Sequence, residues 1–234
     1  MLKVEEANTY YGLSHVLQGV SLEVADKEIV TLVGRNGAGK TTTLKSILGI
    51  TPVRSGKIWF DEGDISALPT HLIIQRGISY VPEERRIIPG LSVRENLKLA
   101  MLKSRNRNRE SEMIERVAKY FPVLKARLKQ QGTSLSGGEQ QMLAIARGLV
   151  TDPKIILIDE PTEGLMPLLV ETIAEIIQTI NQTGVTVLLV EQNVEMALSI
   201  SHRAYVIDEG RIQTSGQARD ILQDQEIQRR YLTV

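Results

Sequence analysis

The sequence lacks cysteine, an excess of either charge and any long apolar run. Its 234 residues include no cysteine, which excludes disulfide bonds and thiolate metal sites and is compatible with a reducing cytosol. Basic and acidic residues number 28 each, so no net field favours nucleic acid. No apolar run approaches the ~20 residues of a spanning helix, and residues 1–6 do not resemble a signal peptide. Any membrane role is therefore expected to depend on partner proteins.

A glycine-rich segment follows the apolar run 29–33 and has the pattern of a phosphate-binding loop. Residues 34–41 read GRNGAGKT, with a helix-like segment after them. The glycines let backbone N–H groups turn toward phosphates, Lys40 brings an ammonium to the outer two phosphates, and the Thr41 hydroxyl can ligate Mg²⁺. We therefore predict a nucleoside triphosphate site formed by Gly34, Arg35, Asn36, Gly37, Ala38, Gly39, Lys40, Thr41 and Thr42.

A second anion-binding pattern lies about 100 residues further along the chain. Residues 135–141 read LSGGEQQ and lead into a helix-like pattern that continues to Leu149. The hydroxyl of Ser136 and the amides of Gly137 and Gly138, at a helix N-terminus, form a site for negative charge. The loop at 34–41 and this second site cannot easily bind the same phosphate within one chain. One of them is therefore expected to serve a second copy or a partner.

A third motif consists of an apolar strand that ends in two adjacent acids. The run 155–158 is apolar on both faces, which is typical of a central parallel strand. Asp159 at its end is placed to hold Mg²⁺ through water. Glu160 can then orient and deprotonate an attacking water molecule.

The wider pattern alternates strands and helices. Strands are expected at 2–5, 17–24, 29–33, 57–60, 155–158 and 185–190, and helices after Lys40 and at 93–102, 110–120, 137–149 and 169–180. This order predicts a doubly wound α/β sheet with an inserted helical lobe. We expect a single domain over 1–234, with a nucleotide-binding core at about 1–90 and 150–234 and a helical subdomain at about 91–149.

With these three motifs in this order, the chain resembles the ATP-binding subunits of ABC transporters over its whole length. The resemblance implies a phosphate-loop (RecA-like) core with an N-terminal antiparallel β subdomain, and ATP and Mg²⁺ as cofactors. In that family two subunits close head to tail around two ATP molecules, each loop facing the other subunit's LSGGE signature. It also implies two integral-membrane permease subunits as partners and a peripheral position on the cytoplasmic face of the inner membrane.

The resemblance also assigns an adenine-stacking aromatic residue upstream of the loop. Tyr11 fits this role because it directly precedes Gly12, and an aromatic face stacks on any base. Tyr10 is the competing assignment.

Three positions depart from the commonest pattern of the family. Glu83 stands where glutamine is usual, and its carboxylate can ligate Mg²⁺ or a bound water molecule. Gln192 replaces the histidine that contacts the γ-phosphate, and Met166 replaces an aspartate. Together they favour pairing with a second, non-identical ATPase subunit that supplies the missing aspartate and histidine.

The same departures refine the resemblance. VPEERRIIPG at 81–90, GLMP at 164–167 and VEQN at 190–193 are similar to the smaller of the two ATPases of bacterial branched-chain amino-acid importers. Such importers also use a periplasmic solute-binding protein. The ATPases of urea or short-amide importers share most of these features and are the alternative. A soluble ABC-type ATPase of repair or translation is a rival of another class, which is expected to need a coiled-coil insertion or a second cassette.

A basic stretch at 98–109 raises the possibility of nucleic-acid binding. It contains no aromatic residue, and acids follow at Glu110 and Glu112. A solvated segment between helices is therefore expected, with no nucleic-acid partner.

Overall fold

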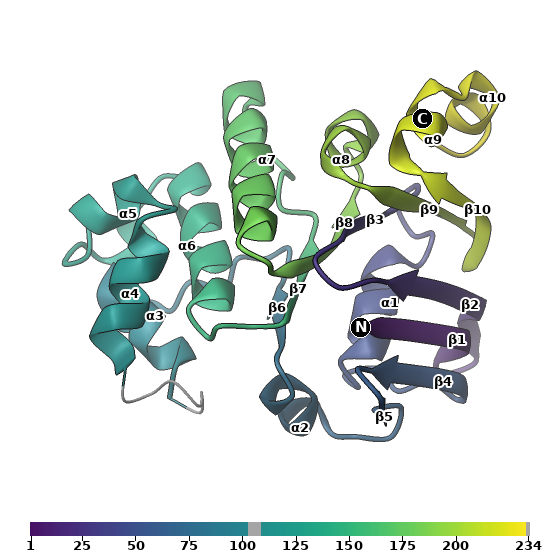
Figure 1. The fold of residues 1–234 in the computed structure, drawn as a ribbon, viewed down its shortest axis with the longest axis horizontal. Coiled ribbons are helices and arrows are strands. Elements are labelled where there is room, and N and C mark those ends of the chain that lie inside the picture. The colour runs from purple at the N-terminus through teal and green to yellow at the C-terminus, as the bar shows by residue number, and fades with distance from the viewer. Residues whose placement is uncertain (103–108, 233–234) are drawn as a thin grey trace.

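The structure is a computed structural model that describes residues 1–102 and 109–232. They form two β-sheets with helices packed around them (Figure 1). Residues 103–108, in the basic stretch at 98–109, lie outside the described part. Within the described residues, no helix combines the length and the apolar character needed to cross a membrane.

The N-terminal third of the chain builds an antiparallel sheet. Its strands, in spatial order, are β2 (Ser14–Val24), β1 (Leu2–Tyr11), β4 (Ser55–Phe60) and β5 (Gly63–Asp64). Leu2 and Val4 on β1 are buried, whereas Lys3 between them is exposed, as expected for a sheet with one face on the core.

The second sheet is mainly parallel, and its central strands are buried on both faces. In spatial order it contains β10 (Arg211–Gln217), β9 (Arg203–Asp208), β3 (Ile29–Val33), β8 (Thr186–Glu191), β7 (Ile155–Asp159) and β6 (Ile78–Val81). Along β7, Ile156 and Ile158 face one hydrophobic cluster, and Ile155 and Leu157 face the other. This explains why the sequence of β7 is apolar at successive positions rather than at alternate ones.

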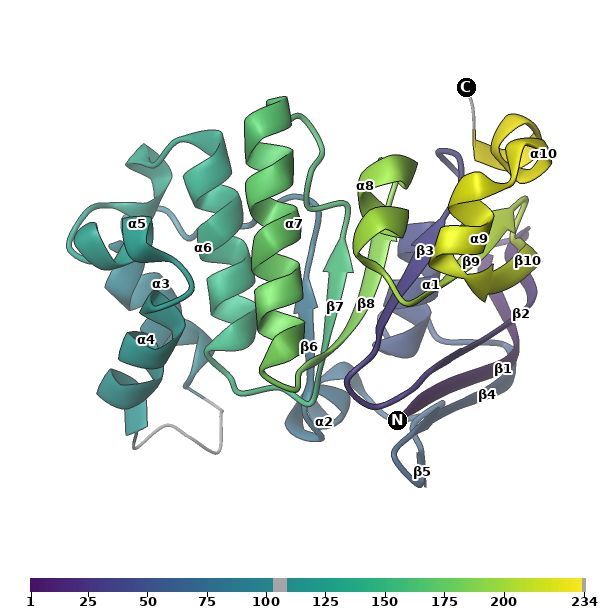
Figure 2. The same cartoon turned by 45° about the horizontal axis from the view of Figure 1, so that its top comes forward.

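Helices cover the two faces of this sheet differently, as Figure 2 shows. One face carries α6 (Gly137–Leu149), α7 (Pro167–Gln182), α8 (Val194–Ile200) and α9 (Ala218–Gln223). The other face carries α1 (Lys40–Ile47), which lies between the two sheets and contacts β1, β2, β7 and β8. The remaining C-terminal turns are α10 (Gln225–Ile227) and η3 (Gln228–Leu232).

A group of helices lies between β6 and β7 in the chain and to one side of the parallel sheet (Figure 1). It contains α3 (Val93–Ala100), α4 (Glu110–Ala118), α5 (Pro122–Ala126), η2 (Gly132–Ser134) and α6. The predicted fold class, a doubly wound core with an antiparallel subdomain and inserted helices, is therefore confirmed.

Several element predictions need correction. The sequence prediction ended β1 at Glu5, whereas the strand continues to Tyr11. It missed the short elements β6, α5, α8 and α2 (Thr70–Gln75), because four to seven residues carry too little periodicity. Helix α3 ends at Ala100, whereas the prediction extended it to residue 102.

Gly210 joins the phosphate-loop region to both sheets. Its N–H donates to the carbonyl of Ala38 at 2.9 Å, and its carbonyl accepts from the N–H of Gln18 at 2.8 Å. Its φ is +75°, and a Cβ atom there would lie 2.0 Å from the carbonyl oxygen of Val16. The close approach of β2 to this turn therefore requires glycine.

We expect Gly210→Ala to lower the free energy of unfolding by about 2–4 kcal/mol, from left-handed strain and overpacking. Urea unfolding measures it. Gly216→Ala is the matched control, because nothing lies within 4 Å of the added Cβ and Gly216 has no positive φ. Equal unfolding midpoints for the two variants would contradict the steric argument.

Candidate functional site

Four neighbouring parallel strands end at the same edge of the sheet, and each delivers a different part of the site. The glycine-rich loop follows β3, the segment with Glu83 follows β6, Asp159 ends β7, and Glu191 ends β8. In open α/β sheets, ligands bind outside the carboxyl ends of the strands. The fold thus brings together segments that lie far apart in the sequence.

The loop surrounds the amino group of Lys40. This side chain is buried, and its Nζ donates to the carbonyl oxygens of Gly34 at 2.9 Å and Arg35 at 3.2 Å. Nζ also lies 3.1 Å from Oε1 of Glu160. Gly39 has a φ of +111°, and a Cβ atom there would lie 2.9 Å from the Leu17 side chain. The loop conformation therefore depends on that glycine.

A cavity of about 410 Å³ opens in front of this loop. Its lining consists of Val16, Asn36, Gly37, Gly39, Lys40, Thr41, Thr42, Glu83, Glu160 and Glu163. Most of the residues predicted for phosphate binding therefore meet in one place with Glu83 and Glu160.

Asp159 is fully buried beside the loop, and both of its oxygens accept hydrogen bonds. Oδ1 accepts from the hydroxyl of Thr41 at 2.9 Å, and Oδ2 accepts from the hydroxyl of Tyr80 at 2.9 Å. Burial raises the pKa of Asp159, and these two bonds oppose the rise. Burial and the neighbouring Asp159 raise the pKa of Tyr80, so its hydroxyl stays protonated and donates.

The donors around Asp159 suit magnesium. A carboxylate and a hydroxyl are hard oxygen ligands, and Mg²⁺ is usually held by one or two such groups together with water and substrate phosphates. In the parts of the chain that the structure describes, no cluster of three or more His, Cys, Asp or Glu side chains forms a metal cage. The carboxylate and the hydroxyl therefore fit a cation that water molecules and substrate phosphates also coordinate.

Acidic side chains crowd the cavity. Glu160 has a φ of +41° and is largely buried next to Lys40, whereas Glu83 and Glu163 are exposed. A hydrogen bond with Glu163, then burial, then the charges of Glu163, Glu160 and Asp159 raise the pKa of Glu83 to about 7. The carboxyl group of Glu83 therefore changes its charge near neutral pH.

Sequence reasoning missed one buried acid beside the site, Glu191. Its buried carboxylate accepts from the N–H of Thr162 at 2.9 Å and from its hydroxyl at 2.7 Å. It also accepts from the N–H groups of Gln192 and Asn193, each at 2.9 Å. Burial raises the pKa of Glu191, and these bonds oppose the rise. An acid at the end of an apolar strand, the signal that pointed to Asp159, could have identified it.

The remaining predicted residues do not line this cavity. Ser136 caps α6 in a capping box with Glu139, and Gly137 and Gly138 begin that helix. Gln192 and Met166 are exposed.

Arg85 connects α6, the helix that begins in the LSGGE signature, to the turn that contains Glu163. Its Nε donates to Oε1 of Gln141 on α6 at 3.0 Å, and its Nη2 donates to the carbonyl of Glu163 at 3.4 Å.

The structure distinguishes the two candidate adenine-stacking tyrosines. The ring of Tyr10 stacks on His15 with centroids 4.2 Å apart, and the Arg54 guanidinium lies 4.0 Å from its centroid. Tyr11 is 47% exposed. Its ring is therefore the more accessible one for a base.

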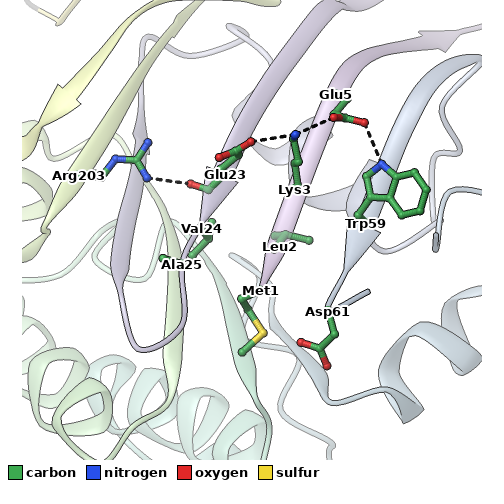
Figure 3. A pocket seen from close by; sticks show the side chains of 10 residues that line it. All are labelled: Met1, Leu2, Lys3, Glu5, Glu23, Val24, Ala25, Trp59, Asp61 and Arg203. Carbon is green, nitrogen blue, oxygen red and sulfur yellow. Dashed lines mark hydrogen bonds and ion pairs between the residues drawn. The ribbon is translucent and has the colours of Figure 1, made fainter. Parts of the chain in front are cut away.

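A larger hollow, of about 580 Å³, lies on the antiparallel sheet (Figure 3). Inside it, Lys3 is paired with Glu5 at 2.8 Å and with Glu23 at 3.2 Å, and Glu5 also accepts from the indole N–H of Trp59 at 2.9 Å. Lys3, Glu5 and Glu23 are thus paired with one another, so none of these three side chains is an isolated charge in the hollow.

Comparison with known proteins assigns the family. Residues 17–163 match the family model described as ABC transporter. The chain belongs to the ABC transporter family. It is an ATP-binding, ATP-hydrolysing subunit of a transporter.

Curated relatives match over almost their whole length. The high-affinity branched-chain amino acid transport ATP-binding protein BraG of Pseudomonas aeruginosa is 41% identical over 99% of each chain. The probable branched-chain amino acid transport ATP-binding protein LivF of Archaeoglobus fulgidus is 37% identical, covering 98% of this chain and 97% of its own. The lipopolysaccharide export system ATP-binding protein LptB of Escherichia coli K12 is 41% identical, covering 97% and 94%.

Solved structures show the same fold. An ATP-binding cassette of an ABC transporter, MJ1267, superposes with a TM-score of 0.88 at 24% identity, covering 97% of this chain and 96% of its own. A dimeric cassette bound to ADP and phosphate, MJ0796, has a TM-score of 0.80 at 26% identity, covering 94% and 99%.

The raised pKa of Glu83 predicts pH-dependent binding of metal-free ATP. Below about pH 7 Glu83 is neutral, and above it the added negative charge repels the triphosphate, so affinity should fall as the pH rises from 6 to 8. Fluorescent-ATP titration in EDTA with the protein and with Glu83→Gln measures this. Protonation of ATP changes both dissociation constants by the same factor. The ratio of the two constants therefore reports the titration of Glu83. A ratio that is the same at pH 6 and pH 8 would contradict the assignment.

Proposed function

We propose that this chain is the ATP-hydrolysing subunit of a bacterial importer that takes up branched-chain amino acids across the inner membrane. The observation that carries this proposal is the similarity to BraG, 41% identical over 99% of each chain. The subunit lies on the cytoplasmic face of the membrane and is held there by two integral-membrane permease subunits. A periplasmic solute-binding protein delivers the amino acid to them.

The geometry supports a division of roles within the site. The loop 34–42 binds the phosphates of ATP, and Tyr11 stacks on adenine. Thr41 and Asp159 hold Mg²⁺, with Glu83 contacting the ion or its water, and bound Mg²⁺ offsets phosphate charge. Glu160 accepts a proton from the attacking water, and Gln192 donates a hydrogen bond to the γ-phosphate.

The pair of Lys40 and Glu160 gives this division a physical basis. The two side chains neutralise each other across 3.1 Å in a largely buried position. A triphosphate competes for Lys40, because its charge exceeds that of one carboxylate. Phosphate binding therefore frees Glu160 to act as a base at the moment when its substrate is present.

The site is completed by a second subunit. In the described residues, Ser136, Gly137 and Gly138 lie outside the loop's cavity, so they act on ATP held by the partner. Because Met166 and Gln192 replace an aspartate and a histidine, the partner is a second, non-identical ATPase. The composite site that uses Glu160 keeps its base but has a weaker phosphate contact.

We expect Glu160→Gln to leave ATP binding intact and to slow hydrolysis at its own site by about 100- to 10,000-fold, since a base is lost. Lys40→Ala should instead abolish ATP binding by this chain. Single-turnover hydrolysis and fluorescent-nucleotide binding measure the two effects. Hydrolysis that is unchanged in the Glu160 variant would refute its role.

The assembled pair provides the matched comparison. Glu160→Gln in this chain and the equivalent change in the partner should reduce steady-state ATPase activity by different factors. Equal reductions would contradict two unequal sites.

The transported solute needs its own test, because 41% identity to LptB shows that similar ATPases serve other cargo. We expect the importer, reconstituted in proteoliposomes with its permeases, to hydrolyse ATP faster when the binding protein carries leucine, isoleucine or valine. Stimulation by urea or a short amide instead would identify the alternative cargo. ATPase activity that is indifferent to permeases and binding protein would favour a non-transport ATPase.

A further inference from the structure

The carboxylate of Asp159 is held by two donors that come from different elements. Thr41 belongs to α1, directly after the nucleotide loop, and Tyr80 belongs to β6. A change in the loop on nucleotide binding acts on Thr41 directly. Tyr80, in contrast, is fixed by the sheet, because β6 pairs with β7 along its length.

The register explains how Tyr80 reaches Asp159. Tyr80 is opposite Leu157 in the parallel pair, and Asp159 follows two residues later on β7. Residues i and i+2 of a strand share a face, and each residue adds about 3.3 Å. Asp159 therefore lies roughly 6.6 Å beyond Leu157 along the strand. The side chain of a tyrosine is long enough to bring its hydroxyl across this distance. Phenylalanine at this position would fill the same space without donating.

We propose that Tyr80 is a positioning residue that fixes the Asp159 carboxylate for Mg²⁺. By donating to Oδ2 at 2.9 Å, the tyrosine restricts the carboxylate to one orientation and directs Oδ1 to Thr41 and the loop. Asp159 has no exposed surface, so water does not replace this donor. The inference rests on the role proposed above for Asp159 in holding Mg²⁺.

A residue that forms a hydrogen bond with a metal ligand, and so orients it, typically contributes 10- to 100-fold to metal affinity. Tyr80→Phe removes the hydroxyl and keeps the ring, which packs against the core between the sheets and lines a groove beside α6. The substitution therefore isolates the hydrogen bond from the packing of the residue.

The test is binding of fluorescent ADP to the full chain while Mg²⁺ is varied, since ADP avoids turnover. For Tyr80→Phe we expect the Mg²⁺ concentration at half effect to rise about 10- to 100-fold, with ADP affinity in EDTA unchanged. Electron paramagnetic resonance of Mn²⁺ with ADP should show a matching loss of bound metal. An unchanged Mg²⁺ requirement would overturn the proposal, as would equal losses of affinity with and without metal.

Tyr205→Phe is the matched control. Its hydroxyl is also bonded, accepting from the N–H of Glu23 at 3.0 Å and lying 2.7 Å from Arg203 Nη2, but it lies on β9 away from Asp159. We expect it to leave the Mg²⁺ requirement unchanged, and an equal shift in both variants would overturn the proposal. If the unsubstituted chain binds ADP without any Mg²⁺ dependence, the proposed role of Asp159 fails as well. A normal Mg²⁺ dependence that Tyr80→Phe leaves unchanged refutes only the role of Tyr80.

Discussion

Repulsion between carboxylates is the constraint on which the arrangement of this site depends. The strand ends bring Glu83, Asp159, Glu160 and Glu163 together where a polyanionic nucleotide must bind. Each acid is compensated differently. Glu160 is paired with Lys40, Asp159 accepts two hydroxyl bonds, and Glu83 has a pKa raised to about 7, so it is neutral below that pH. When nucleotide and cation bind, they replace these partners within the chain. Binding is therefore linked to a rearrangement of charge in the site.

Glu191 shows the structural use of a buried acid beside that functional cluster. Its two oxygens accept from Thr162 on one side and from Gln192 and Asn193 on the other. It therefore connects the turn after Glu160 with the loop that carries Gln192. Arg85 makes a comparable connection from the turn to α6 through Gln141. Hydrogen bonds thus connect the turn after Glu160 with the loop that carries Gln192 and with α6.

The chain places its phosphate-binding loop and its signature residues in different parts of the fold. Its loop and acids surround one cavity, and its signature residues face elsewhere. The dimeric cassette of similar fold, bound to ADP and phosphate, shows that such subunits assemble in pairs. Under the proposed function, ATP held between two subunits couples hydrolysis to assembly and so to movement of the permeases.

The sequence alone determined the fold class and pointed to the loop, the signature and the acid pair, because each motif is contiguous and its strand–loop–helix context is local. Only the tertiary structure decided which side chains meet. Tyr80 and Asp159 are 79 residues apart, and Thr162 and Glu191 are 29 apart. Their contacts depend on the spatial order β3-β8-β7-β6, which differs from chain order. The tertiary structure also decided that Tyr10 packs against His15 and Arg54, whereas Tyr11 is exposed. Periodicity in a sequence reports which face of an element is buried, but the pairing of distant strands brings these donors and acceptors within bonding distance.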